Sequence, residues 1–144
     1  MRAWPRSPDS HLVLLIVGAL AFGCGGDDET TGPTPQSGPI IGTWTATSFT
    51  IDGFDAIGAG ATITFIFSSD GTYTVAVTGD QAGFFCEGTT DCIEGGVFTA
   101  TTTMVVLDPG TVDEVTVAIS INADVLTVTG TIEGFDVVGT FLRV

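Results

Sequence analysis

The 144-residue chain is poor in basic residues: it has three arginines, no lysine and one histidine, His11. Without lysine no Schiff base can form, and a single histidine leaves little room for general-base or imidazole–metal chemistry. Acidic residues number 17, which gives a formal charge of −14. Because phosphate binding needs clustered Lys and Arg, we expect no nucleic-acid partner.

A long apolar run is also missing. The run from residue 12 to residue 22 is too short for a membrane-spanning helix, which needs about 20 residues. It follows an arginine-containing start and ends at Gly23, which is the layout of a secretory signal peptide. We therefore expect residues 1–23 to be an export signal.

Cys24 follows Gly23 directly, and with this cysteine the signal resembles that of a bacterial lipoprotein. In that family the cysteine becomes the first mature residue and carries the acyl chains that anchor the protein to the membrane. Phe22 departs from the family's motif, which has a small residue there. The alternative is an ordinary signal peptide with a chance cysteine near its end.

Residues 24–39 contain glycines, three prolines, Thr, Ser and an acidic run, with no large apolar residue. Such a segment cannot bury enough surface to offset its ordering entropy, so it predicts a flexible acidic tether. In enterobacterial lipoproteins an Asp directly after the cysteine retains the protein at the inner membrane. Gly25 stands there, so the resemblance implies a protein anchored at the outer membrane, with the periplasmic or surface face left open.

Removal of the signal would take Asp9, Arg2 and Arg6 with it. The mature chain would keep 16 acids and one base, Arg143, for a formal charge of −15. Such a charge keeps a domain soluble, and it also favours cations as partners over anions. The sequence leaves both interpretations open.

Residues 40–144 alternate apolar and polar side chains with a period of two, as in Thr62 to Phe67, which is typical of strands. No segment has a convincing helical period. The pattern predicts eight strands: 41–51, 60–67, 72–78, 95–101, 103–107, 114–121, 125–132 and 136–144. Because short connections favour sequential antiparallel pairing and closure removes exposed edges, we expect an all-β, small eight-stranded antiparallel up-and-down barrel.

Gly42, Thr43 and Trp44 resemble the Gly-x-Trp opening of the lipocalins and of smaller lipocalin-like bacterial domains, which are eight-stranded up-and-down barrels. In lipocalins a late arginine packs across this tryptophan. The resemblance implies that Arg143 does so here, as a cation–π pair worth about 0.5–2 kcal/mol. The alternative for Trp44 is a core aromatic residue of a β-sandwich.

In an up-and-down barrel alternate connections lie at the same end, so most acids of the domain should gather opposite Trp44. The residues expected there are Asp52, Asp55, Asp80, Glu87, Asp91, Glu94, Asp108, Asp113, Glu133 and Asp136.

Two of these connections have similar sequences, residues 50–55 and 131–136, and the first and last strands of a closed barrel are neighbours. The similarity favours an acidic, aromatic rim around a ligand mouth. Its candidate residues are Asp52, Phe54, Asp55, Glu133, Phe135 and Asp136. The alternative is two similar turns built from good turn residues.

Cys86 and Cys92 remain after lipidation of the third cysteine, and in an oxidising compartment they should form a disulfide. A metal site with Glu87, Asp91 and Glu94 is the competing interpretation. It would require a reducing compartment for thiolate ligands, and the oxygen spacing typical of calcium is absent. We expect no metal and no cofactor.

The sequence marks no pair of carboxylates and no activated serine, so we expect no enzyme. We expect a lipocalin-like module, anchored to the membrane by its lipid, that binds a small apolar or amphipathic ligand. The alternative is a structural or interaction lipoprotein with a packed barrel, whose acidic rim contacts another envelope component. The interior volume separates the two, since eight strands leave room for side chains or one small ligand.

Overall fold

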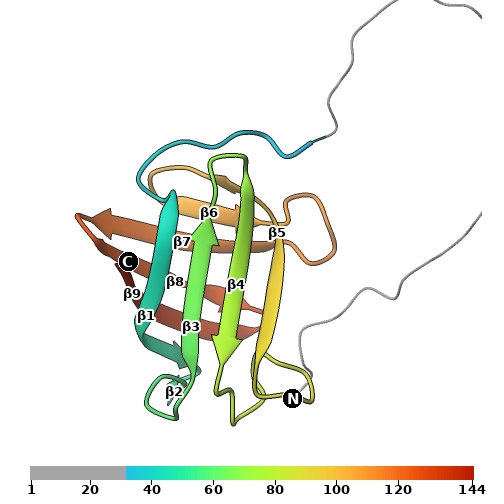
Figure 1. Ribbon diagram of the computed structural model, residues 1–144, viewed down its shortest axis with the longest axis vertical. Helices are drawn as coiled ribbons and strands as arrows, with labels where there is room; N and C mark the ends of the chain where they lie inside the picture. Colours follow the sequence, from blue (N-terminus) through green and yellow to red (C-terminus); the bar gives the residue numbers. More distant parts are fainter. Residues whose placement is uncertain (1–31) are drawn as a thin grey trace, which may run out of the picture.

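Nine strands follow one another in the computed structural model, which describes residues 32–144 (Figure 1). They are β1 (Gly42–Ile51), β2 (Phe54–Asp55), β3 (Thr62–Phe67), β4 (Thr72–Thr78), β5 (Cys92–Ala100), β6 (Met104–Leu107), β7 (Val115–Asn122), β8 (Val125–Ile132) and β9 (Phe135–Arg143). From β3 to β9 each strand pairs with the next, β1 pairs with β3, and β1–β9 pairing closes the ring. The predicted eight-stranded antiparallel up-and-down barrel is confirmed, with β2 as one short extra strand.

The predicted strand bounds agree with the observed ones most closely where Thr and β-branched residues alternate. Two strands, β4 and β8, have the predicted bounds. The largest difference is at β5, which begins at Cys92 rather than at residue 95. The two-residue strand β2 was not predicted.

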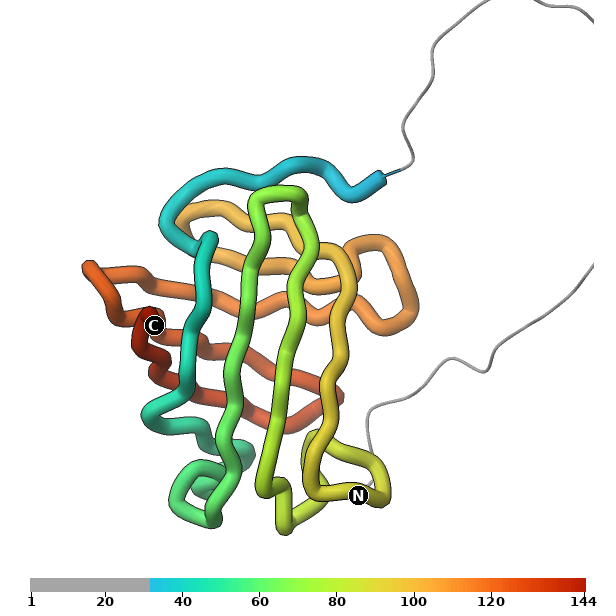
Figure 2. The backbone as a smooth tube through the Cα atoms, in the orientation of Figure 1, coloured from blue at the N-terminus to red at the C-terminus, as the bar shows by residue number. Residues whose placement is uncertain are grey.

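The barrel consists of two crossed halves. Strands β1, β3, β4 and β5 run side by side, and β6 to β9 cross behind them at a steep angle (Figures 1 and 2). Alternate side chains point inward, and aromatic rings fill much of the space between the halves. Phe65 and Phe67 stack with centroids 5.6 Å apart, and Phe65 meets Phe141 edge to face at 5.7 Å.

Trp44 is fully buried and closes one end of the barrel. Its Nε1 donates a hydrogen bond to the carbonyl oxygen of Ile40 at 2.7 Å, and the Arg143 guanidinium carbon lies 4.3 Å from the ring centroid. Gly42 has a φ of +139°, and a Cβ there would come within 2.6 Å of Arg143 Nη1. Glycine at position 42 therefore allows both the positive φ and the close approach of the Arg143 guanidinium.

Residues 32–39, the described part of the predicted tether, lie across the same end of the barrel (Figure 2). The Gln36 N–H donates to the Ser69 carbonyl oxygen at 2.9 Å, and Gln36 Oε1 accepts from the Ala100 N–H at 3.2 Å. A Cβ on Gly71 would clash with the backbone of Thr34, so only glycine lets the chain pass so close.

Candidate functional site

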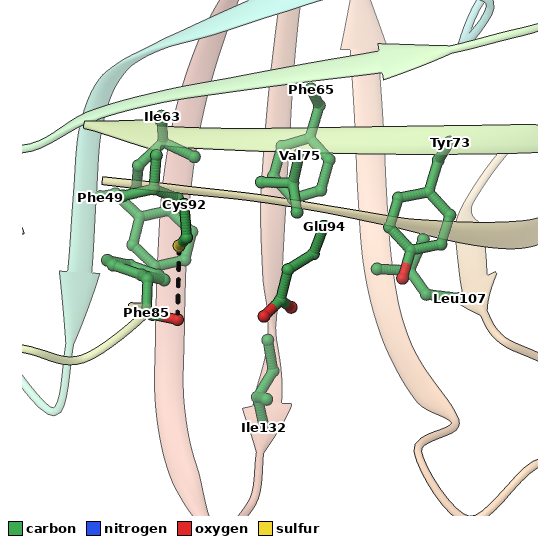
Figure 3. A pocket seen from close by; sticks show the side chains of 11 residues that line it. Phe49, Ile63, Phe65, Tyr73, Val75, Phe85, Cys92, Glu94, Leu107 and Ile132 are labelled. Atoms are coloured by element: carbon green, nitrogen blue, oxygen red, sulfur yellow. Dashed lines mark hydrogen bonds between the residues drawn. The ribbon is translucent and has the colours of Figure 1, made fainter. Parts of the chain in front are cut away.

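Two small apolar cavities lie inside the barrel. The first, which we call the Glu94 cavity, has a volume of about 70 Å³ (Figure 3). Its lining residues are Phe49, Ile63, Phe65, Tyr73, Val75, Val77, Phe85, Cys92, Glu94, Leu107 and Ile132. The second, the core cavity, has a volume of about 60 Å³ and shares Phe49, Phe65, Leu107 and Ile132 with the first.

The volumes limit what the interior can hold. Sites for drug-sized ligands measure about 300–1,000 Å³, and one water occupies about 30 Å³ of the liquid. The Glu94 cavity therefore admits a short alkyl segment and excludes a large lipid, unless side chains move.

Among residues 32–144, Glu94 is the only charged residue that lines the Glu94 cavity. Figure 3 shows its side chain pointing from β5 into the cavity toward Ile132. The preceding residue, Ile93, points outward and is 75% exposed. The sequence had placed Glu94 in a connection that ran to residue 94, which is wrong because β5 begins at Cys92 and turns this side chain inward.

The barrel wall is incomplete beside Glu94. Strand β6 pairs only with Phe98 to Ala100, the last three residues of β5. Asp108 ends this pairing: its N–H donates to the Val97 carbonyl oxygen at 2.8 Å, and its Oδ1 accepts from the Val97 N–H at 3.1 Å. Glu94 lies just before this point on β5, and the residue is partly exposed.

Tyr73 also lines the cavity and is 8% exposed. Its hydroxyl donates to Asp108 Oδ2 at 2.7 Å. Burial raises the pKa of Tyr73 well above its usual value, and the hydrogen bond and charge of Asp108 raise it further. The charges of Glu94 and Asp113 add to the increase in this pKa, so three carboxylates act on one part of the cavity.

The position of Asp108 corrects one expectation. The sequence had placed it with the other acids opposite Trp44. However, β6 is short and pairs with the second half of β5, so Asp108 meets Tyr73, the second residue of β4. The connection between β6 and β7 projects from the side of the barrel (Figure 1).

The connection between β4 and β5 closes the cavity from one end. Cys86 and Cys92 form the predicted disulfide, with Cα atoms 5.5 Å apart. The Asp80 side chain, 4% exposed, accepts hydrogen bonds from the N–H groups of Phe84, Phe85 and Cys86 at 3.2, 2.7 and 2.9 Å. These contacts hold the Phe85 ring 5.6 Å from that of Phe49, inside the barrel.

The two similar connections are both tight hairpin turns. Asp52 and Gly53 have φ values of 48° and 82°, and Glu133 and Gly134 have values of 52° and 88°. Two successive positive φ values in a two-residue hairpin loop are typical of type I′ turns, in which Asp-Gly is favoured. This turn chemistry explains why the two sequences resemble each other.

The six candidate rim residues are only partly brought together. The Asp52 N–H donates to the Asp136 carbonyl oxygen, and the Asp136 N–H donates to Asp52 Oδ1, both at 2.8 Å. Phe54 packs on Phe84, with centroids 5.0 Å apart, rather than forming a pair with Phe135.

The other rim residues have local roles. Asp55 Oδ1 accepts from the Gly58 N–H at 2.9 Å, and Phe135 packs against the buried core. Glu133 occupies the turn before β9. The rim residues line neither interior cavity, so the mouth suggested by the sequence and the observed Glu94 cavity are different places.

The sequence named Asp80 and Glu94 only among the acids expected opposite Trp44, and Glu94 also as a ligand of the competing metal site; it predicted neither an inward Glu94 nor the loop contacts of Asp80. Glu and two following glycines are unfavourable in strands, which concealed the start of β5. Alternation traced backward from Phe98 through Gly96 would have placed Glu94 on the inward face. The role of Asp80 depends on the folded loop, and no sequence signal indicated it.

Cys24 and residues 1–31 lie outside the described residues. Within residues 32–144 no group of three or more His, Cys, Asp and Glu side chains could hold a metal ion. The same residues contain no helix long and apolar enough to span a membrane.

No protein-family model matches the chain, and the search of curated proteins found no match.

Proposed function

We propose that the protein is a non-enzymatic binding module that holds a short apolar or amphipathic ligand in its barrel. The observation that carries the proposal is the Glu94 cavity: about 70 Å³, lined by aliphatic and aromatic side chains and by one partly exposed acidic residue, Glu94. Cavities that hold small ligands in proteins have this composition, with few polar groups among apolar ones.

The energetics favour a small ligand of modest affinity. Each buried methylene contributes about 0.8 kcal/mol, so a buried segment of two or three methylenes contributes about 2 kcal/mol. The remaining affinity has to come from contacts where the cavity meets solvent. A binding site of this kind suits a compact molecule with one polar end.

We further propose that residues 1–23 direct export and that acyl chains on Cys24 anchor the barrel to the bacterial envelope, at the outer membrane. This rests on the lipoprotein-like signal. Two or three chains, at about 0.8 kcal/mol per buried methylene, would hold the protein there far more firmly than one. The intact mass of the mature protein tests it: we expect a chain that begins at an acylated Cys24, and an unmodified cysteine or a cut elsewhere would contradict the anchor.

Ligand binding can be tested by amide NMR during titration with n-hexanol, a neutral probe with a flexible apolar tail. We expect saturable shifts at residues that line the Glu94 cavity. Val75→Phe, which adds a ring inside the cavity, should abolish them, whereas the matched control Ile93→Phe, with its ring on the outer surface, should keep them. Absent shifts in the wild type, or equal shifts in Val75→Phe, would contradict the proposal.

The alternative is a structural or interaction protein whose packed barrel presents acidic residues to another envelope component. The small cavities and the aromatic packing of Phe65, Phe67 and Phe141 favour it. An envelope component that co-purifies with the wild type and is lost on Asp55→Asn, while n-hexanol produces no shifts, would support this alternative.

A further inference from the structure

Strand β5 reverses the usual polarity of a barrel strand at two adjacent positions. Side chains alternate between core and solvent, so a half-buried strand places apolar residues inside and polar ones outside. Here Ile93, 75% exposed, faces outward, and Glu94 faces the cavity. A carboxylate among apolar side chains costs free energy through lost hydration. Packing alone would favour the opposite arrangement, so apolar packing does not account for the inward carboxylate.

The charged groups that act on Tyr73 are all acidic. Glu94, Asp108 and Asp113 all act on the Tyr73 hydroxyl, which lines the same cavity. Arg143 is the only lysine, arginine or histidine from residue 32 to residue 144. It lies at the closed end of the barrel, where its guanidinium packs over Trp44. A ligand entering the cavity therefore meets a field that attracts cations and repels anions.

The Glu94 carboxylate can take a ligand cation in addition to its contacts within the protein. An ionised carboxylate offers about four acceptor positions on its two oxygens. Its partial exposure leaves a way for a hydrated head group to approach. A hydrogen bond between an ammonium and a carboxylate is roughly twice as strong as one between neutral groups.

We propose that the ligand is a small primary amine, protonated at neutral pH, whose ammonium group binds the Glu94 carboxylate while its alkyl or aryl tail occupies the cavity. This inference rests on the proposed binding function and specifies its ligand class. The tail contacts the aromatic lining at Phe49 and Phe65. Fatty acids and other carboxylates are excluded, because their head group would face Glu94.

The test compares three probes that share one six-carbon tail: n-hexylamine, n-hexanol and n-hexanoate. Affinities are measured by amide NMR titration at neutral pH. For the wild type we expect the amine to bind about tenfold more tightly than the alcohol, and the carboxylate more weakly than both. Glu94→Gln keeps the side-chain size and removes the charge, so it should abolish the preference for the amine while n-hexanol binding is retained.

Glu87→Gln is the matched control, since Glu87 is exposed on the preceding connection and does not line the cavity. It should keep the full preference for the amine. Retained n-hexanol binding also shows that Glu94→Gln is folded. If Glu94→Gln does not fold, the wild type alone decides the question by its affinities for the amine and the alcohol.

The outcomes separate this inference from the function on which it rests. Equal binding of amine and alcohol by the wild type would overturn the amine assignment and leave the binding function intact. An unchanged preference in Glu94→Gln would also overturn it. Binding of none of the three probes would overturn the proposed function itself.

Discussion

At the scale of single residues, Arg143 holds the N-terminal segment to the closed end of the barrel. Its Nη1 donates to the Ile41 carbonyl oxygen at 2.8 Å and its Nη2 to that of Pro39 at 2.6 Å, while the guanidinium covers Trp44. Its ion pair with Asp124, at 3.4 Å, lies on the surface, where the Asp124 side chain is 75% exposed.

Arg143→Ala should lower the free energy of unfolding by about 2 kcal/mol, because it removes the cation–π contact and both hydrogen bonds. Asp124→Asn is the control: it removes only the exposed ion pair and should cost less than about 0.5 kcal/mol. Urea denaturation measures both. Equal effects of the two variants would show that the surface pair, and not the contact with Trp44, stabilises this end.

Tyr73 should make the fold sensitive to alkaline pH. Its pKa in the folded protein is raised by burial and by Asp108, so the folded state favours the neutral phenol. The contribution of the neutral Tyr73 phenol to the free energy of unfolding is therefore fully present below about pH 10, the usual tyrosine pKa. It decreases as the pH rises above this value. The chain has one tyrosine, so near-ultraviolet absorbance follows its ionisation directly.

We expect the phenolate signal to appear only as the barrel unfolds, and Tyr73→Phe to lose less stability above about pH 10 than the wild type. A phenolate that forms near pH 10 while circular dichroism remains native would contradict the assigned environment.

At the scale of elements, the connection between β4 and β5 depends on its disulfide and on Asp80. Replacing both Cys86 and Cys92 with Ala should cost about 2 kcal/mol, since the bond closes a small loop in the unfolded chain. Hydrogen exchange should quicken in residues 80–92 and stay unchanged in β8 and β9. Reduction of the wild-type protein should reproduce the pattern without altering the side chains, and faster exchange throughout the barrel would contradict a local role.

The strands could be predicted where alternation and turn residues are both strong, as in β4 and β8. The beginning of β5 could not, because Glu94, Gly95 and Gly96 have low strand propensity and are held there by pairing with β4. Strand β2 contains only two residues and depends on its pairing with Thr50 and Ile51.

The candidate site could be predicted less well than the fold. The sequence marked the connections as the place for a ligand, whereas the cavity is lined mainly by inward side chains of the strands. Its volume depends on how rings such as Phe49, Phe65 and Phe85 pack, and the Tyr73–Asp108 contact joins residues 35 positions apart. Such features follow from tertiary pairing and not from a local pattern.

At the scale of the whole molecule, a lipoprotein-like N-terminus precedes a closed barrel, and the barrel contains two small apolar cavities, one of which is lined by Glu94. The barrel and the cavity belong to the described residues, and the anchor and the ligand are proposals. Their common consequence is a protein that would collect a short cationic amphiphile at a membrane surface.

Native mass spectrometry of the protein purified from its own cell envelope tests the central claim most directly. The account predicts that the wild type retains a small molecule with an apolar tail and an amine, and that Val75→Phe, prepared in the same way, does not. Recovery of the wild type without any retained small molecule, or of the same molecule from Val75→Phe, would contradict a ligand in the Glu94 cavity.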